Sequence, residues 1–168
     1  MTMIVIAGRP SSGKTLWAVQ HARKAMLEKR AVVFFELEVS EEFLRQRYGL
    51  PESARVLDRS DPSTHDIAVL IERYRPDVCI VDYVQLLSDW NEDCLFRLQE
   101  HAARYNVELV ATSQVRASVS HERRLPRPED LHRVRLPSDV TFLALARDTC
   151  AAPGCACVER SRGERVGV

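Results

Sequence analysis

Short runs rich in apolar residues alternate with stretches of helical periodicity along this chain. The runs cover residues 4–7, 31–38, 55–57, 78–82, 107–112 and 140–146. Near-continuous apolar runs of this length are typical of strands that are buried on both faces, as in a parallel sheet. Because these strands alternate with helices, the pattern predicts an α/β fold.

Three of the intervening stretches repeat apolar residues at spacings of three or four, which predicts helices with one buried face. The repeating positions are Leu16, Val19, Ala22 and Met26; Ile67, Leu70, Ile71 and Tyr74; and Leu95, Leu98, Ala102 and Tyr105. Two helix starts are marked as well. Ser40 precedes the acidic pair Glu41 and Glu42, and Ser63-x-x-Asp66 is a capping box.

Length, composition and charge narrow the class of protein. With 168 residues, of which 45% are hydrophobic and 29% charged, the chain is expected to form one globular domain over residues 1–168. The formal net charge is +0, so any nucleic acid must bind a local basic patch. Five cysteines, an odd number, favour a reducing cytoplasm over a disulfide scaffold. No apolar stretch approaches the ~20 residues of a membrane span, and the first has neither the length nor the basic flank of a signal peptide.

The strongest chemical signal lies between the first apolar run and the first helical stretch. Gly8-Arg9-Pro10-Ser11-Ser12-Gly13-Lys14-Thr15 is a complete phosphate-binding loop in the strand–loop–helix context that the motif needs. The glycines let successive backbone N–H groups point into one concavity, and the following helix adds its positive end. We expect the loop to bind ATP, with Lys14 at the β- and γ-phosphates and the Thr15 hydroxyl on Mg²⁺.

Two acids follow apolar runs and are expected on the same rim of the sheet, since ligands of open α/β sheets bind beyond the carboxyl ends of the strands. Asp82 closes the run at residues 78–82 and can hold the Mg²⁺ shell beside Thr15. Glu38 closes the run at residues 31–38. It can orient and deprotonate the water that attacks the γ-phosphate, or it can be a solvated loop acid, and its position leaves both open.

Gln114 follows the run at residues 107–112, where an amide can bond a terminal phosphate or simply be a polar residue leaving a strand. Residues 115–137 then form a basic segment of poor periodicity that includes Arg116, Arg123 and Arg124. This segment favours a loop that touches an anionic polymer such as DNA, although a solvated surface loop has the same composition. It contains no aromatic residue, so base stacking is not indicated.

The carboxyl-terminal part carries cysteines and arginines. Cys150, Cys155 and Cys157 lie in a Gly/Pro-containing turn without a nearby histidine, which disfavours a zinc site, because zinc prefers four ligands in paired spacing. Residues 158–163 are interpreted as one arm of a β-hairpin that carries Arg160 and Arg162.

These motifs, taken in order, resemble those of the RecA-like ATPase domain of DnaB-type replicative helicases. The matching stretches are residues 7–15, 35–40, 80–86, 112–114, 124–126, 129–131 and 146–148. They cover nearly the whole chain in colinear order, and Asp82-Tyr83-x-Gln85-Leu86 is a specific run among phosphate-loop proteins. The resemblance implies a RecA-like fold, a mainly parallel sheet flanked by helices. It also implies a working form that is a ring hexamer moving on single-stranded DNA.

The resemblance also assigns roles to individual residues. It makes Glu38 the catalytic glutamate and Gln114 the sensor of the γ-phosphate. Arg160 and Arg162 resemble the basic pair that reaches as a finger into the site of the neighbouring subunit. Arg147, within the matching stretch at residues 146–148, is assigned to nucleotide binding.

The chain departs from the family in several places, including a short segment between Glu38 and Asp82 and, in the finger region, Arg160-Ser161-Arg162-Gly163 where the family usually has an Asn before the Gly. It starts at the first core strand, whereas the family carries an amino-terminal domain and a linker helix that helps to hold the ring. The loop between Leu87 and Asn91 is short where the family carries a longer DNA-facing loop. Three functions stay open: an oligomeric motor on single-stranded DNA, a nucleotide-switched accessory ATPase that binds a replication or recombination partner such as a larger helicase, and a catalytically idle structural subunit.

Overall fold

The computed structural model of the protein describes residues 2–58, 61–116, 125–131, 135–147 and 161–166. Within these residues the chain alternates between strands and helices, as the apolar pattern predicts. The elements are β1 (Met3–Gly8), α1 (Lys14–Leu27), β2 (Val32–Glu36), α2 (Glu41–Tyr48), β3 (Arg55–Asp58), α3 (Thr64–Tyr74), β4 (Val78–Asp82), η1 (Val84–Leu86), α4 (Cys94–Arg104), β5 (Glu108–Gln114), η3 (Pro128–Asp130), β6 (Val140–Arg147) and β7 (Ser161–Val166).

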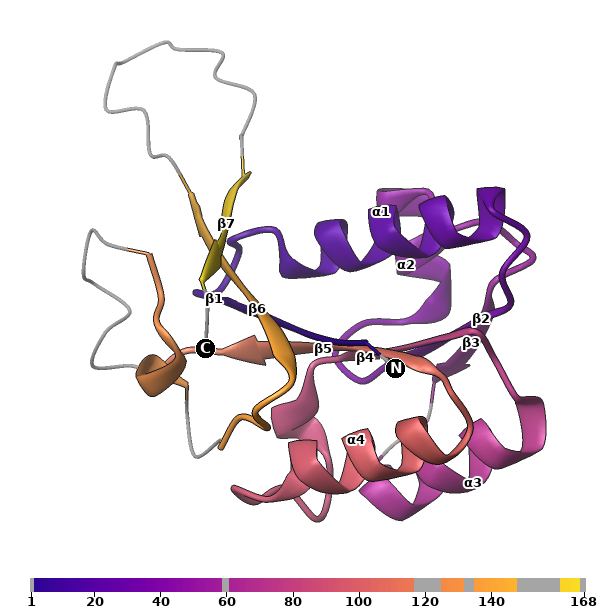
Figure 1. The fold of residues 1–168 in the computed structure, drawn as a ribbon. Coiled ribbons are helices and arrows are strands. Elements are labelled where there is room, and N and C mark those ends of the chain that lie inside the picture. The colour runs from indigo at the N-terminus through magenta and orange to yellow at the C-terminus, as the bar shows by residue number, and fades with distance from the viewer. Residues whose placement is uncertain (1, 59–60, 117–124, 132–134, 148–160, 167–168) are drawn as a thin grey trace, which may run out of the picture.

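All the described strands belong to one seven-stranded sheet in the order β3-β2-β4-β5-β1-β6-β7 (Figure 1). The six strands from β3 to β6 pair in parallel, and β7 pairs antiparallel with β6. The predicted α/β fold and the hairpin at the carboxyl-terminal end are therefore confirmed. Because β1 lies between β5 and β6, the phosphate-binding loop that follows it (the P-loop, residues 8–15) emerges from an inner strand of the sheet.

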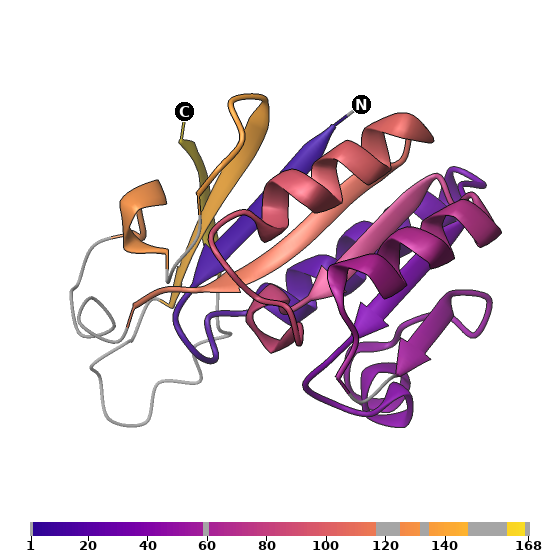
Figure 2. The ribbon, with the colours of Figure 1, turned by 90° about the horizontal axis from the view of Figure 1, so that it is seen from below.

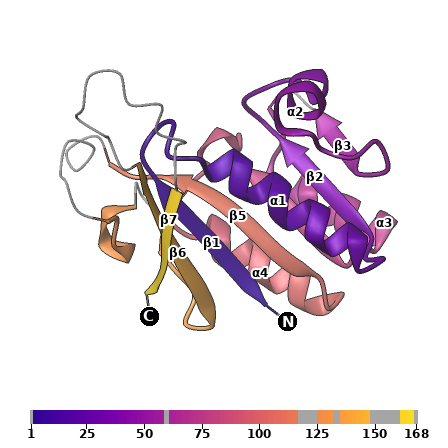
Figure 3. The same cartoon turned by 90° about the horizontal axis from the view of Figure 1, so that it is seen from above.

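Helices cover both faces of the sheet. α1 and α2 lie on one face, where α1 runs across the central strands, and α3 and α4 lie side by side on the other (Figures 2 and 3). Each face has its own core, and alternate residues of a strand contribute to each: Phe34 packs on the α1 side with Val19, and Phe35 packs on the α4 side with Leu98. Burial on both faces explains why these strands read as continuous apolar runs.

Helix starts agree with the sequence, but the buried face of α1 does not. The Ser40 hydroxyl accepts a hydrogen bond from the Phe43 amide (3.2 Å), and Ser63 with Asp66 forms the predicted capping box. On α1 the buried apolar residues are Ala18, Val19, Ala22 and Ala25. Leu16, predicted to be buried, is 37% exposed and lines the cavity beside the loop, so the buried face of α1 consists mainly of small residues.

The end of β2 also differs from the prediction. The strand stops at Glu36, two residues before Glu38, at which the apolar pattern places its end. Glu36 Oε1 accepts hydrogen bonds from the amides of Glu38 (2.8 Å) and Val39 (2.9 Å), so the backbone turns around this carboxylate. Glu38 therefore lies on the loop between β2 and α2 rather than on the strand.

Several predictions fall outside the described residues. These are the proposed DNA contacts Arg123 and Arg124, the finger residue Arg160 and the three cysteines Cys150, Cys155 and Cys157. Arg162 lies on β7, where its backbone pairs with Ala146, and Arg147 ends β6, but nothing is described of either side chain. No helix within the described ranges is long and apolar enough to cross a membrane.

Candidate nucleotide-binding site

The loop between β1 and α1 has a backbone that favours glycine at two positions. Gly13 caps α1 with a φ of 94°, in the left-handed region that favours glycine. A Cβ atom on Gly8 would collide with the hydroxyl of Ser12 and approach the carbonyl oxygen of Leu145 to 3.2 Å. The loop is closed by a hydrogen bond from the Ser12 amide to the Arg9 carbonyl (3.2 Å). The conformation thus favours glycine at the two positions that the motif specifies.

Lys14 begins α1 and folds back over the loop. Its ammonium donates to the carbonyl oxygens of Gly8 (3.2 Å) and Arg9 (3.0 Å). Only 7% of its surface is exposed, and this burial lowers the pKa of Lys14, while the negative charges of Asp82 and Glu38 act in the opposite direction. The cation is thus held at the loop close to both of the predicted acids.

Asp82 lies beneath the start of α1, where β4 ends. Its Oδ1 accepts a hydrogen bond from the Thr112 hydroxyl of β5, and its Oδ2 has no regular partner among the described residues. Burial raises the pKa of Asp82, whereas hydrogen bonds from Thr112 and Thr15 and the charge on Lys14 lower it. The structure therefore brings Thr15 and Asp82 together, as the sequence predicts.

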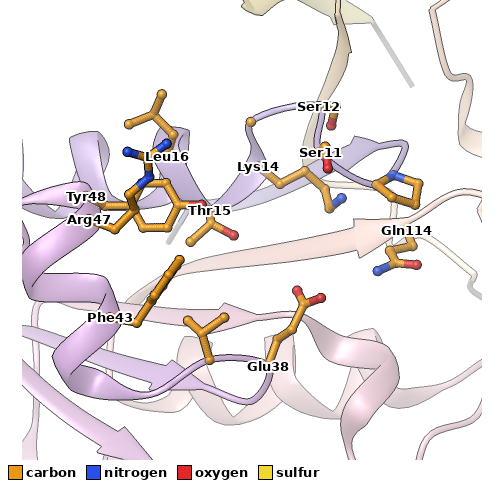
Figure 4. A pocket seen from close by; sticks show the side chains of 13 residues that line it. Ser11, Ser12, Lys14, Thr15, Leu16, Glu38, Phe43, Arg47, Tyr48 and Gln114 are labelled. Carbon is orange, nitrogen blue, oxygen red and sulfur yellow. The ribbon is translucent and has the colours of Figure 1, made fainter.

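Glu38 and Gln114 face the loop across one cavity of about 530 Å³. Figure 4 shows the carboxylate of Glu38 pointing into the space between Lys14 and Gln114. The lining residues are Pro10, Ser11, Ser12, Gly13, Lys14, Thr15, Leu16, Glu38, Val39, Phe43, Arg47, Tyr48 and Gln114. Three segments that lie far apart in the sequence therefore meet at the carboxyl ends of β1, β2 and β5.

Gln114 is fixed by a residue whose role the sequence did not reveal. The Gln85 amide group donates to the Gln114 carbonyl (3.2 Å) and to the Ser113 hydroxyl (2.7 Å), and its oxygen accepts from the Gln114 amide (3.2 Å). Gln85 belongs to the Asp82-Tyr83-x-Gln85-Leu86 run, which the sequence analysis uses only as a mark of the family. Its position three residues after Asp82 was the available signal.

Glu36 is a second residue that sequence reasoning missed. It is the register partner of Asp82 on the neighbouring strand and is only 1% exposed. Burial, and then the charge of Asp82, raises the pKa of Glu36 from 4.5 to about 8, although the two amides bound to Oε1 lower it. An acid directly after the four apolar residues of β2 was the available signal, but Glu38, two residues later, fits the end of the apolar run as well.

The far end of the cavity is apolar and aromatic. Leu16, Phe43, Arg47 and Tyr48 gather there, away from Lys14, Glu38 and Gln114 (Figure 4). Phe43 and Tyr48 meet edge to face with ring centroids 5.8 Å apart. Sequence reasoning did not single out Phe43, Arg47 and Tyr48, because it considered only where α2 begins and ends.

Arg116, the one proposed DNA contact within the described residues, has structural partners. Its amide donates to the Asp130 carbonyl (2.8 Å) and its Nε to the Leu131 carbonyl (3.0 Å). An isolated bridge between Val115 and Leu131 lies beside these bonds. Arg116 thus attaches the segment at residues 125–131 to the end of β5, while its side chain remains exposed.

The part of the chain that the structure describes holds no group of three or more His, Cys, Asp or Glu residues arranged to bind a metal. A divalent ion beside Thr15 and Asp82 would have to complete its shell with phosphate oxygens and water. Mg²⁺ is commonly bound in this way, by one or two carboxylates together with substrate phosphates.

Comparisons with known proteins agree with the fold and the loop. A model of the DnaB-like helicase C terminal domain matches residues 1–60, which include the P-loop and Glu38. Among solved structures, the chain is similar to one described as an "ATPase Domain", with a TM-score of 0.74 and 20% identity over 92% of this chain and 72% of that one. A search of curated proteins gives no match.

A second similar structure is described as "The Structure Of A DnaB-Like Replicative Helicase And Its Interactions With Primase". The TM-score is 0.73 with 18% identity, over 96% of this chain and 55% of that chain. This chain thus spans about half the length of that helicase. The match over residues 1–60 and the shared fold confirm that this chain resembles the RecA-like ATPase domains of DnaB-type helicases.

Proposed function

We propose that the protein binds ATP with Mg²⁺ and hydrolyses it, coupling hydrolysis to single-stranded DNA within an oligomer. The observation that carries this proposal is the convergence of Lys14, Glu38 and Gln114 on the cavity lined by the P-loop. The cavity volume of about 530 Å³ lies in the range of sites that hold ligands of nucleotide size.

At the polar end of the cavity the side chains suit phosphate hydrolysis. Glu38 orients a water molecule for in-line attack on the γ-phosphate and accepts its proton. Lys14 exchanges its bonds to the Gly8 and Arg9 carbonyls for the phosphate oxygens and stabilises the charge that develops there. Gln114 bonds the terminal phosphate, so its position differs between the ATP and ADP states.

Thr15 and Asp82 fit the ion that accompanies ATP, since one carboxylate oxygen of Asp82 is buried without a regular hydrogen bond among the described residues. When bound, Mg²⁺ supplies neutralisation of the phosphate charge. At the other end of the cavity, Phe43 and Tyr48 offer rings against which a purine can pack, and Arg47 offers a planar cation.

The DNA and the oligomer rest on other residues. Arg116 follows Gln114 by two positions, and Arg123 and Arg124 follow in the same basic segment, so the proposed phosphate sensor and the proposed DNA contacts are close in the sequence. Arg160 and Arg162 are proposed to reach the site of a neighbouring subunit, and Arg162 lies on β7, the strand at the edge of the sheet. Arg147, which ends β6, is proposed to bind the nucleotide. The working oligomer is proposed to be a hexamer.

ATP turnover with and without single-stranded DNA tests the proposal. A motor is expected to hydrolyse ATP faster when DNA is present, and the stimulation should fall as salt rises, because phosphate contacts release counterions. Glu38→Gln should abolish turnover while ATP still binds. Tight ATP binding with slow turnover that ignores DNA would instead support a nucleotide-switched accessory protein, and turnover unaffected by Glu38→Gln would refute the assigned mechanism.

A further inference from the structure

Three polar side chains form a row on the α1 side of the sheet, where β2, β4 and β5 end. They are Glu36, Asp82 and Thr112. Two positions earlier on the same strands stand Phe34, Ile80 and Val110, which all belong to the core cluster beneath α1. Because side chains two residues apart in a strand share a face, the row points toward the start of α1, where Thr15 and Lys14 lie.

The two acids of this row are register partners on adjacent parallel strands. Both are 1% exposed, and each leaves one oxygen, Glu36 Oε2 and Asp82 Oδ2, buried without a regular hydrogen bond among the described residues. Buried polar atoms are nearly always bonded, and an unsatisfied carboxylate oxygen on each of two neighbouring strands is costly. A bound divalent cation would satisfy both oxygens.

The hydrogen bonds that Glu36 accepts from the loop between β2 and α2 involve only one of its two carboxylate oxygens. Oε1 alone accepts both loop amides, from Glu38 at 2.8 Å and Val39 at 2.9 Å. A neutral side chain with a single acceptor would hold the loop equally well and would not place a second carboxylate against Asp82. The hydrogen bonds to the loop therefore do not explain why residue 36 is an acid with a second buried oxygen, Oε2.

We propose that Glu36 is a third group of the cation site, a carboxylate that acts with Thr15 and Asp82 on the nucleotide-bound divalent ion. It contacts the ion through one of the ion's water molecules, since a hydrated Mg²⁺ keeps several waters in its shell. The same side chain anchors the loop that carries Glu38, so the occupied cation site and the position of the proposed catalytic base are linked through one residue. The inference rests on the proposed nucleotide function.

Binding of Mn²⁺ to the full chain in saturating ADP, followed by electron paramagnetic resonance, tests this role without any turnover. Glu36→Gln keeps an acceptor for the loop amides and removes only the charge. Glu36→Asp keeps the charge with a shorter reach. Glu42→Gln, an exposed position on α2 that does not line the cavity, is the control for a lost negative charge.

Loss of an outer-shell partner typically weakens metal binding by about 10- to 100-fold. We expect Glu36→Gln to weaken Mn²⁺ affinity by about tenfold or more on that basis, Glu36→Asp to weaken it less, and Glu42→Gln to leave it unchanged. Wild-type affinity in a folded Glu36→Gln, or an equal loss in Glu42→Gln, would overturn the role. If the wild-type chain binds neither ADP nor Mn²⁺, the proposed nucleotide function itself fails, and this inference with it.

Discussion

Replacement of Glu36 by glutamine should change how the stability of the metal-free protein depends on pH. Burial and the neighbouring Asp82 raise the pKa of Glu36 from 4.5 to about 8 in the folded chain. Between these values the unfolded chain has ionised this carboxyl and the folded chain has not. The wild type therefore keeps the full contribution of the neutral carboxyl below pH 4.5 and loses it as the pH rises toward 8.

The magnitude follows from the size of the shift. Each unit of pKa difference corresponds to about 1.4 kcal/mol, so the cost to the wild type grows by at most about 1.4 kcal/mol per pH unit and reaches at most about 5 kcal/mol above pH 8. This is a large share of the ~5–15 kcal/mol that stabilises a typical domain. Glu36→Gln cannot ionise and escapes that cost.

Urea unfolding of both chains in EDTA, followed by circular dichroism between about pH 5.5 and 8.5, measures the effect. The stability difference, variant minus wild type, should increase with pH across this window and level off above pH 8. Taking the difference cancels the titration of groups that do not interact with Glu36, and Glu42→Gln provides the comparison for an exposed glutamate. A difference that stays flat with pH would refute the claim that Glu36 is buried next to Asp82 without a compensating cation.

Three further changes test other parts of the structure. Gly8→Ala should weaken binding of a fluorescent ATP analogue while the protein stays folded, because the added Cβ displaces the Ser12 hydroxyl and comes within 3.2 Å of the Leu145 carbonyl oxygen; unchanged binding would contradict the loop geometry. Gln85→Ala removes the bonds that hold Gln114 and should lower kcat by about 10-fold or more, as misplacement of a reacting group does, with little change in ADP affinity. Phe34→Ala, fully buried beneath α1, should cost about 3–5 kcal/mol in urea unfolding, and a loss below about 1 kcal/mol would mean that this core is not packed as described.

The sequence determines the fold more completely than the site. Apolar runs that are buried on both faces and two capping serines specify the strands and the starts of α2 and α3, which the structure confirms. The P-loop pattern predicts the turn between β1 and α1 because its two glycines suit the backbone there. A side chain at Gly8 would be crowded, and Gly13 has a left-handed backbone conformation. These features are local, so neighbouring residues are enough to predict them.

The errors and omissions arise where contacts between different elements determine the position of a residue. Helical periodicity could not place Leu16, because the depth at which α1 sits depends on its alanines and on the sheet beneath them. The apolar pattern misplaces the end of β2, since the hydrogen bonds of Glu36 to the next loop are invisible in an apolar run. The structural role of Gln85 could not be predicted from nearby residues, because its partners Ser113 and Gln114 lie 28 and 29 residues away along the chain.

Gln114, the proposed phosphate sensor, is connected by hydrogen bonds to η1, and the neighbouring Arg116 is connected to the segment at residues 125–131. Gln85 binds the backbone of Gln114 and belongs to η1, which begins two residues after Asp82. Two residues beyond Gln114, Arg116 bonds the carbonyls of Asp130 and Leu131. A shift of Gln114 on loss of the γ-phosphate would strain the bonds of Gln85 and displace residues 125–131 with the end of β5. These direct hydrogen bonds provide a physical route from the phosphate end of the cavity to the basic segment, without requiring any change in the core of the sheet.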